Sequence, residues 1–235
     1  MYCFDSRVRY SETDERGRLS LTGILNYLQD CSTFQSEDLG MGIEYLKAHD
    51  RAWWLSSWQI VIDRYPELGE RIVVSTWPYD FKGIYGYRNF AIQDTQGHFL
   101  VRANSVWFFF DTEKQRPAKV AAEDIRGYGD PEPRLSMEYA PRKIRLTEEY
   151  EEKRPIQVVR HHLDTNHHVN NARYVEIARE VLPEGISIKE IRVEYKKAAF
   201  LGDYMTPRVT KTREGYVTAL CDSQGSAYAV IWLRE

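Results

Sequence analysis

LDTNHHVNNARYVEIARE, residues 163–180, places six Asp, Asn and His side chains within eight positions and follows them with a helical pattern. In the helical part, Tyr174, Ile177 and Ala178 recur at the three- and four-residue steps of one helix face. Buried polar groups cost free energy unless each is paired, so such a cluster makes a poor structural core. Protonatable groups at the start of a helix suit acid-base or hydrolytic chemistry. The cluster of Asp164, Asn166, His167, His168, Asn170 and Asn171 therefore marks this stretch as the candidate functional region.

The bulk composition narrows the class of protein. The chain has 235 residues, enough to bury a core as one large domain or two small ones. It is 43% hydrophobic and 29% charged with a formal net charge of -3, which does not indicate a nucleic acid partner. No window approaches the ~18 apolar residues of a membrane span, and the N-terminus lacks a signal-peptide pattern. We therefore expect a soluble, cytoplasmic protein with no membrane contact.

The cysteines and histidines give no indication of a metal or a disulfide framework. Cys3, Cys31 and Cys221 are odd in number and widely spaced, so we expect reduced thiols in strands or core. The histidine pairs at 161–162 and 167–168 offer four imidazoles, but adjacent side chains diverge on a strand. We expect no metal and no cofactor.

The first half of the chain predicts one long helix and several strands. Apolar residues recur at three- and four-residue steps between Leu19 and Leu39, as one face of a long helix requires. A strand is expected at residues 4–10 before this helix. Four more are expected after it, with the sequences WWLSSWQIVIDRY, RIVVSTWPYD, YGYRNFAIQD and HFLVRANSVWFFFD. This order is typical of an α+β layer in which the helix packs on an antiparallel sheet.

The second half repeats the first. The strand, polar turn and helix of RVRYSETDERGRLSLTGILNYLQD match VVRHHLDTNHHVNNARYVEIARE. ELGERIVV at 67–74 matches FLGDYMTP at 200–207, and the turn DTQG at 94–97 matches DSQG at 222–225. Similar offsets in the same order indicate a tandem duplication. Each half outlines a hotdog domain, a long helix wrapped by a sheet, and two such domains would pack edge to edge as a pseudo-dimer.

A segment rich in proline separates the two halves. Residues 127–142, GYGDPEPRLSMEYAPR, contain three prolines and little periodicity, which predicts a linker. We place an N-terminal domain at 1–128, the linker at 129–143 and a C-terminal domain at 144–235.

The polar run of the second half is similar to a known motif. Asp164-x-Asn166-x-His168-Val169-Asn170-Asn171, followed by Tyr174, resembles the active-site motif of the acyl-acyl carrier protein thioesterases, tandem-hotdog enzymes of plants and bacteria. EYKKAAFLGD at 194–203 is similar to the second motif of that family, and LNYLQD at 25–30 to its first helix. The resemblance spans nearly the whole chain. It implies hydrolysis of the thioester between a fatty acyl chain and the phosphopantetheine of acyl carrier protein, which releases a free fatty acid.

The resemblance also implies roles for the two domains and for individual residues. The N-terminal domain would cradle the acyl chain, and the C-terminal domain would carry catalysis with Asp164, Asn166 and His168. We expect Asp164 to activate water or attack directly, Asn166 to orient the water or the carbonyl, and His168 to pass a proton. The expected oxyanion hole consists of backbone N–H groups at the helix start, those of Val169, Asn170 and Asn171.

Each of these assignments has a structural alternative. Asp164 suits a helix N-cap, Asn166 an Asx-turn and His168 a partnered loop position. Asp14 in ETDERG resembles the catalytic turn of single-hotdog acyl-CoA thioesterases. It lacks an amide and an imidazole beside it, so we expect a surface turn there.

The second motif departs from the family pattern. The family usually has a Glu, often followed in plants by a Cys, where this chain has Ala198 and Ala199. Neither a Cys–His nucleophile nor that Glu is therefore present, and Glu194 would need a different strand face or register. Two alternative functions stay open, an acyl-CoA thioesterase and a degenerate hotdog that binds acyl chains or the carrier without hydrolysis.

Substrate and carrier contacts are expected at aromatic and basic residues. The candidates for closing the acyl cavity are Trp53, Trp54 and Trp58. The resemblance implies an acidic acyl carrier protein as partner, so its dock should be basic, and the candidates are Arg142, Lys143, Arg145, Lys196 and Lys197. Both a monomeric pseudo-dimer and a homodimer fit these expectations.

Overall fold

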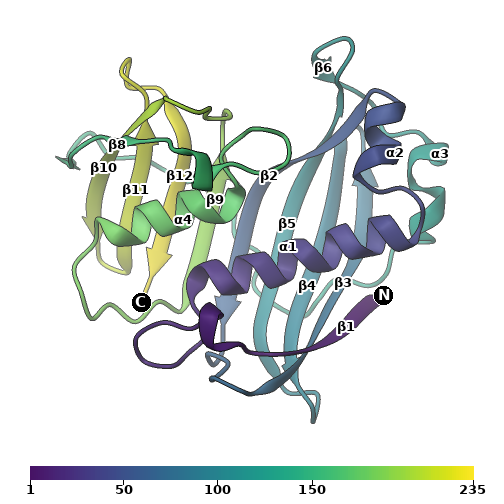
Figure 1. Ribbon diagram of the computed structural model, residues 1–235, viewed down its shortest axis with the longest axis horizontal. Helices are drawn as coiled ribbons and strands as arrows, with labels where there is room; N and C mark the ends of the chain where they lie inside the picture. Colours follow the sequence, from purple (N-terminus) through teal and green to yellow (C-terminus); the bar gives the residue numbers. More distant parts are fainter. The chain divides into compact units, whose positions relative to one another are not determined.

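The computed structural model describes residues 1–235 as two compact units. The first unit comprises Met1–Ser56 and Ile62–Tyr139, and the second comprises Ser57–Val61 and Ala140–Glu235. In each unit a helix lies across one face of an antiparallel sheet (Figure 1). This arrangement confirms the α+β class and the repeated combination of helix and sheet. None of the helices combines the length and the hydropathy needed to cross a bilayer.

The first unit packs its long helix α1 on a sheet with the strand order β1-β3-β4-β5-β2. The strands are β1 (Tyr2–Arg7), β2 (Arg51–Ile62), β3 (Arg71–Lys82), β4 (Tyr85–Asp94) and β5 (Phe99–Asp111), with the short β6 (Arg116–Pro117) beside β5. The helices are α1 (Leu21–Asp38), α2 (Ile43–Ala48) and α3 (Ala122–Ile125), with 3-10 turns η1 (Tyr10–Glu12) and η2 (Arg126–Tyr128).

The predicted apolar stripe is the face that α1 turns toward the sheet. Ile24, Leu28 and Cys31 are all 0% exposed, and the Cys31 thiol lies 3.6 Å from the carbonyl oxygen of Val74 in β3. The helix begins at Ser20, whose hydroxyl accepts a hydrogen bond from the Gly23 N–H at 3.0 Å. The apolar spacing gives the buried face of α1, and the Ser20 cap fixes where the helix begins. The spacing alone was enough for the sequence to predict this helix.

The second unit repeats the layers with a shorter helix. Its strand order is β9-β12-β11-β10-β7, and Ser57–Val61 of β2 pair with β9. Its elements are β7 (Glu151–Glu152), β8 (Ile156–Gln157), η3 (Arg160–His162), α4 (Asn171–Glu180), β9 (Glu190–Tyr195), β10 (Tyr204–Thr212), β11 (Gly215–Cys221) and β12 (Ala227–Arg234). On the sheet, a core cluster forms around Ile144, Val217 and Val230.

The duplication is visible in the backbone hydrogen bonds. In the first unit the Val8 N–H donates to Glu70 at 2.9 Å, and the Val8 carbonyl accepts the Gly69 N–H at 2.9 Å. In the second unit the Val158 N–H donates to Asp203 at 2.8 Å, and its carbonyl accepts the Gly202 N–H at 3.0 Å. The same pair of bonds thus joins the segment before the polar turn to the matched loop in each copy.

One expectation about local structure needs correction, and one is confirmed. The strand expected at residues 4–10 ends at Arg7, because η1 begins at Tyr10. The three thiols are free and lie in core or strand as expected: Cys31 and Cys221 are buried, and Cys3 lies exposed on β1. Alternation in FDSRVRY marked the strand, but nothing in it marked the 3-10 turn.

The proline-rich segment has no regular structure from residue 129 to 150 and is nevertheless anchored. In the first unit, the Trp77 indole N–H donates to the Pro133 carbonyl at 2.9 Å, and the Asn89 side chain accepts the Leu135 N–H at 3.0 Å. In the second unit, the Arg192 guanidinium donates to the carbonyl oxygens of Pro141 and Lys143. The segment thus contributes packing to each unit.

Candidate active site

The polar run forms a tight turn that backbone bonds close. The Asp164 N–H donates to His168 at 2.8 Å, and the His167 N–H donates to Asp164 at 3.1 Å. Leu163 and Val169 pair across the turn as an isolated β-bridge. His167 takes a φ of 60°, in the left-handed region that few residues other than glycine adopt. The backbone therefore sets the shape of the turn.

The Asp164 carboxylate is oriented by this turn. Its Oδ1 accepts the N–H groups of Asn166 at 2.8 Å and His168 at 3.3 Å, whereas Oδ2 accepts no hydrogen bond. The carboxylate is half-buried. One oxygen thus holds the turn, and the other is available to a reacting water. The N-cap alternative for Asp164 does not hold, because Asn170 caps α4 by accepting the Ala172 N–H at 2.9 Å.

The other two predicted catalytic residues lie on the same turn with different surroundings. The half-buried His168 ring meets the Phe200 ring edge to face, with centroids 4.9 Å apart and planes at 86°. Asn166 is exposed. Phe200 itself is positioned by Asp203, whose Oδ2 accepts the Phe200 N–H at 2.9 Å. The loop of the second motif therefore supports the imidazole through an aromatic contact.

The structure corrects the predicted oxyanion role of Val169 and Asn170. The Val169 N–H donates to the Ala199 carbonyl at 3.0 Å, and the Asn170 N–H donates to the His162 carbonyl at 2.8 Å. Both amides precede the helix and bind the fold instead of a ligand. Asn171 is the first residue of α4, and the oxyanion role of its N–H stays a prediction. The Asn171 carbonyl accepts a hydrogen bond from the Tyr195 hydroxyl at 2.9 Å.

Ala199 ties the turn to the helix behind it. It is 0% exposed, and its N–H donates to the Tyr174 hydroxyl at 3.0 Å. Because its carbonyl accepts the Val169 N–H, one buried alanine joins the end of the turn to α4. Glu194 is engaged elsewhere: Oε2 accepts the Ile144 N–H and Oε1 pairs with Lys196, both at 3.1 Å. It therefore gives the turn no second carboxylate, as its strand position led us to expect.

Burial of Tyr174 gives a pH-dependent stability. Burial, above all other causes, raises the pKa of Tyr174 from 10.0 to about 12. The unfolded chain therefore loses this proton at lower pH than the folded chain, so the stabilisation is complete below pH 10 and is lost as pH rises to about 12. Tyr174→Phe should lower the free energy of unfolding by about 1–3 kcal/mol at pH 8, because it leaves the Ala199 N–H unpaired.

Denaturant unfolding at several pH values between 8 and 12 measures both effects. The Tyr174→Phe curve should fall less steeply above pH 10 than the wild-type curve. Tyr10→Phe is the matched control, because Tyr10 is 84% exposed. Parallel wild-type and Tyr174→Phe curves across this range would contradict the assignment.

Two residues near the turn make contacts that the sequence did not predict, His162 and Asp203. The half-buried His162 accepts the Val159 N–H at its Nδ1 at 3.2 Å, and burial followed by the neighbouring His161 and Arg173 lowers its pKa. Asp203 also accepts the Tyr228 hydroxyl at 3.2 Å. The duplication could have indicated both contacts, because the first unit has a matching pair. Glu12, at the position of His162, accepts the Arg9 N–H, and Glu70, at the position of Asp203, accepts the Glu67 N–H.

The first unit contains a second copy of the turn, in which the carboxylate has a different set of partners. Oδ1 of Asp14 accepts the N–H groups of Arg16 at 3.0 Å and Arg18 at 2.9 Å, as Oδ1 of Asp164 does for its own turn. Oδ2 of Asp14, however, pairs with the Arg18 guanidinium at 3.1 Å. Arg18 occupies the position that His168 holds in the second copy. The Asp14 carboxylate is thus fully engaged, which supports the surface-turn interpretation.

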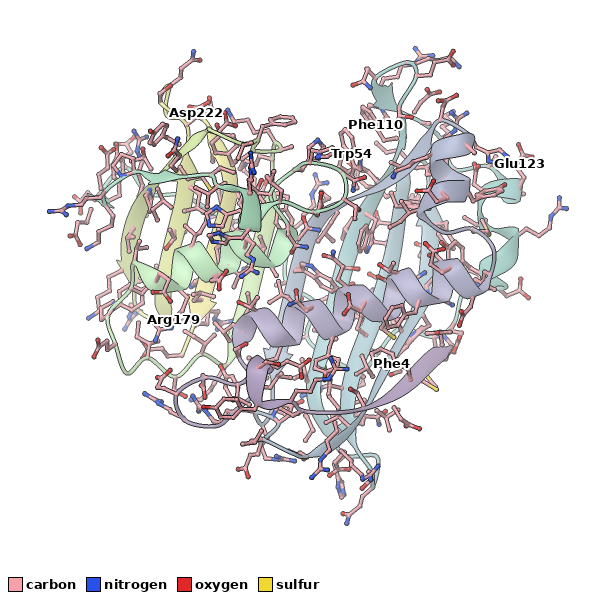
Figure 2. All side chains as sticks on the ribbon, viewed as in Figure 1. Phe4, Trp54, Phe110, Glu123, Arg179 and Asp222 are labelled. Carbon is pink, nitrogen blue, oxygen red and sulfur yellow. The ribbon has the colours of Figure 1, made fainter.

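The three tryptophans expected at the acyl cavity do not share one surface. Trp53 lines a pocket of about 140 Å³ in the first unit. Trp54 is the next residue on β2, where successive side chains point to opposite faces, and it stacks on Phe110 with ring centroids 3.9 Å apart (Figure 2). Trp58 belongs to the second unit and is 2% exposed. Only Trp53 of the three lines this pocket.

The five basic residues expected at a carrier dock are all exposed residues of the second unit. Two of them already have acidic partners: Lys196 pairs with Glu194, and Lys197 pairs with Asp222 and lies 4.5 Å from the Tyr228 ring centroid. The other three, Arg142, Lys143 and Arg145, lie in the segment that precedes the core residue Ile144 or directly follows it.

Sequence comparison identifies related proteins along most of the chain. Residues 2–128 match the acyl-ACP thioesterase N-terminal domain, and residues 145–230 match the acyl-ACP thioesterase C-terminal domain. A chloroplastic palmitoyl-acyl carrier protein thioesterase of Arabidopsis thaliana is 25% identical over 201 residues, covering 76% of this chain and 47% of that protein. Oleoyl-acyl carrier protein thioesterase 1 of the same plant is 24% identical and covers 88% of this chain and 63% of its own length. The chain spans about half the length of several such relatives.

Solved structures show the same fold. An acyl-ACP thioesterase from Bacteroides thetaiotaomicron superposes with a TM-score of 0.89 at 23% identity, covering 99% of this chain and 96% of that one. The 12:0-ACP thioesterase from Umbellularia californica gives 0.86 at 19% identity, with the same coverage. These likenesses confirm the tandem hotdog fold.

Proposed function

Because the chain belongs to the acyl-ACP thioesterase family, we propose that it hydrolyses the thioester of an acyl group on acyl carrier protein and releases a free fatty acid. The observation that carries this proposal is the contrast between the two copies of the polar turn. In the first copy Arg18 occupies Oδ2 of Asp14, whereas in the second copy Oδ2 of Asp164 accepts no hydrogen bond. A carboxylate oriented through one oxygen and available at the other suits a general base.

The proposed reaction uses the three residues of the second turn. Oδ2 of Asp164 takes a proton from a water molecule as the water oxygen attacks the thioester carbonyl carbon. The Asn166 amide orients the carbonyl or the water. The tetrahedral intermediate then collapses, the carbon–sulfur bond breaks, and the leaving thiolate takes a proton from the protonated His168. Transfer of the proton held by Asp164 back to His168 through water restores both groups. Phe200 keeps the imidazole in place through its edge-to-face contact.

The two units are proposed to have different roles, acyl-chain binding and catalysis. Residues 1–128 would bind the acyl chain and residues 144–235 would carry catalysis, with 129–143 between them. The pocket beside Trp53 supports the first role, and the Asp164 turn supports the second. For the carrier, the exposed Lys143 and Arg145 are better candidates than Lys196 and Lys197, because carrier carboxylates would compete at the latter two with Glu194 and Asp222. Arg142 stays a candidate on its exposure alone. A cytoplasmic location and a monomeric or homodimeric state stay predictions.

A hydrolysis assay on the purified full chain tests the proposal. Thiol release from acyl-ACP and acyl-CoA substrates of several chain lengths is expected to show turnover with a higher kcat/KM for the carrier-bound substrates. Equal or better turnover of acyl-CoA would reassign the substrate. Binding of acyl chains with no hydrolysis of any thioester would instead show a non-catalytic hotdog. This is the alternative that follows from Ala198 standing in place of the family's Glu.

A further inference from the structure

The pocket in the first unit has an aromatic wall and a polar floor. It lies between α1, α2 and the sheet, has a volume of about 140 Å³, and its aromatic lining comes from Trp53, Phe81, Tyr87, Trp107 and Tyr128. Arg88 of β4 also lines it. A cavity of about 150 Å³ accommodates a benzene molecule, so this pocket has room for an apolar group of about that size.

Arg88 is a buried cation without a carboxylate partner. It is 8% exposed, and none of the ion pairs of the chain includes it. Its Nη1 donates to the Gln35 side chain and to the Thr76 hydroxyl, and its guanidinium lies 5.2 Å from the Tyr128 ring centroid. Nε and Nη2 make no hydrogen bond within the protein. Buried charges in proteins are normally paired, so this arginine lacks a counterion.

The one acid in the pocket lining does not serve as that counterion. Oε1 of Glu37 accepts the Ile43 N–H at 2.9 Å, which binds the carboxylate to the first residue of α2. Burial lowers the pKa of Arg88, the direction expected for a desolvated cation, although a guanidinium stays protonated at neutral pH. An anion entering the pocket would offset this desolvation.

We propose that the pocket binds a carboxylic acid as its anion, with Arg88 pairing with the carboxylate through Nε and Nη2 and the aromatic wall covering the apolar part of the acid. A guanidinium offers two parallel N–H groups to a carboxylate, and such charge-assisted pairs are stronger than neutral hydrogen bonds. A plain alkyl group would fill the same volume and leave the cation unpaired. The pocket should therefore prefer a carboxylate ligand to an uncharged ligand of the same shape.

Two sources provide such a carboxylate. One is the free fatty acid that the proposed hydrolysis releases, which would make the pocket a product site. The other is an acyl group that carries a second carboxyl at its far end. Only the assignment of a source rests on the proposed function, because binding of a carboxylate to Arg88 requires no turnover.

Calorimetric titration of the full chain with octanoate and with 1-octanol tests the proposal. The wild type should bind octanoate at least about tenfold more tightly than octanol, because hydrogen bonds to a charged group contribute that much. Arg88→Met should remove most of this difference by weakening octanoate and not octanol. Arg71→Met is the matched control, since Arg71 is an exposed arginine of β3, and it should leave both affinities unchanged.

Three outcomes would overturn the proposal: no binding of octanoate, equal binding of octanoate and octanol, or unchanged octanoate affinity in a folded Arg88→Met variant. Circular dichroism establishes whether that variant folds. The comparison of octanoate with octanol on the wild type does not depend on whether Arg88→Met folds. Arg88→Lys keeps the positive charge but loses the two parallel N–H donors of the guanidinium, so it should retain part of the preference for octanoate over octanol.

A second pair of measurements separates the sources. Competitive inhibition of hydrolysis by octanoate identifies the released acid as ligand. A lower KM for the thioester of octanedioic acid than for the octanoyl thioester identifies the distal carboxyl of an acyl group. If no thioester is hydrolysed, the proposed function fails, and the titration still decides whether the carboxylate site exists.

Discussion

Asp164→Asn is expected to lower kcat for thioester hydrolysis by about 10²- to 10⁴-fold, the range that a positioned general base contributes. The asparagine side-chain oxygen can still accept the N–H groups of Asn166 and His168, so the turn should keep its shape. What the variant loses is the negative oxygen that takes a proton from water. KM should change little, because the substitution leaves the acyl pocket intact. Steady-state kinetics on an acyl-ACP substrate measure both constants.

Asp14→Asn is the matched control for this experiment. It makes the same chemical change in the same turn of the other unit, where the carboxylate pairs with Arg18. The pair is half-buried and lies outside the proposed catalytic turn, so the variant can lose some stability but should fold and should keep its turnover. Unchanged kcat in Asp164→Asn would refute the general-base role. A large loss of kcat in Asp14→Asn alone would move the site to the first unit.

Gly215→Ala is expected to destabilise the second unit by about 3 kcal/mol or more. Gly215 begins β11 with a φ of +134°, a conformation that residues with a side chain rarely adopt. A Cβ there would lie 2.1 Å from the Leu233 carbonyl oxygen and 2.9 Å from the Arg234 Cα. Both atoms are backbone of the paired strand β12, so the clash is relieved only by opening the sheet. The midpoint of urea unfolding, followed by circular dichroism, gives the change.

Gly83→Ala separates the clash from the cost of positive φ alone. Gly83 has a φ of +65° between β3 and β4, and a Cβ there would meet no atom within 4 Å. Its cost should be about 1–2 kcal/mol, that of a left-handed residue with a side chain. Equal destabilisation by the two substitutions would show that the approach of Leu233 to Gly215 is not the cause.

Local patterns were enough to predict much of the fold. The spacing of Ile24, Leu28 and Cys31 predicted the buried face of α1, and internal similarity predicted two copies of one domain. Both depend on residues close in sequence or on a repeat that is visible along the chain. The location of the candidate turn followed in the same way, from the polar residues between Leu163 and Asn171.

Details of the site depended on contacts between distant residues. The amides of Val169 and Asn170 look unpaired in the sequence, and only the fold brings Ala199 and His162 to them. Arg88 has a local signal in the sequence: in the predicted strand it shares a face with Phe90 and Ile92, both of which are 0% exposed. A charged residue at a predicted core position indicates a special environment, but its partners in α1 and β3 become known only when the chain folds.

The two Asx-type turns separate the evolution of function from that of stability. In both copies one carboxyl oxygen and backbone bonds hold the loop, and the residues at 16 and 18 differ entirely from those at 166 and 168. Replacing Asn166 or His168 therefore keeps these bonds, because they come from backbone N–H groups, backbone carbonyls and the Asp164 carboxylate. The exposed side chain of Asn166 can thus change without loss of the loop, so its persistence in a homologue would report selection for activity itself.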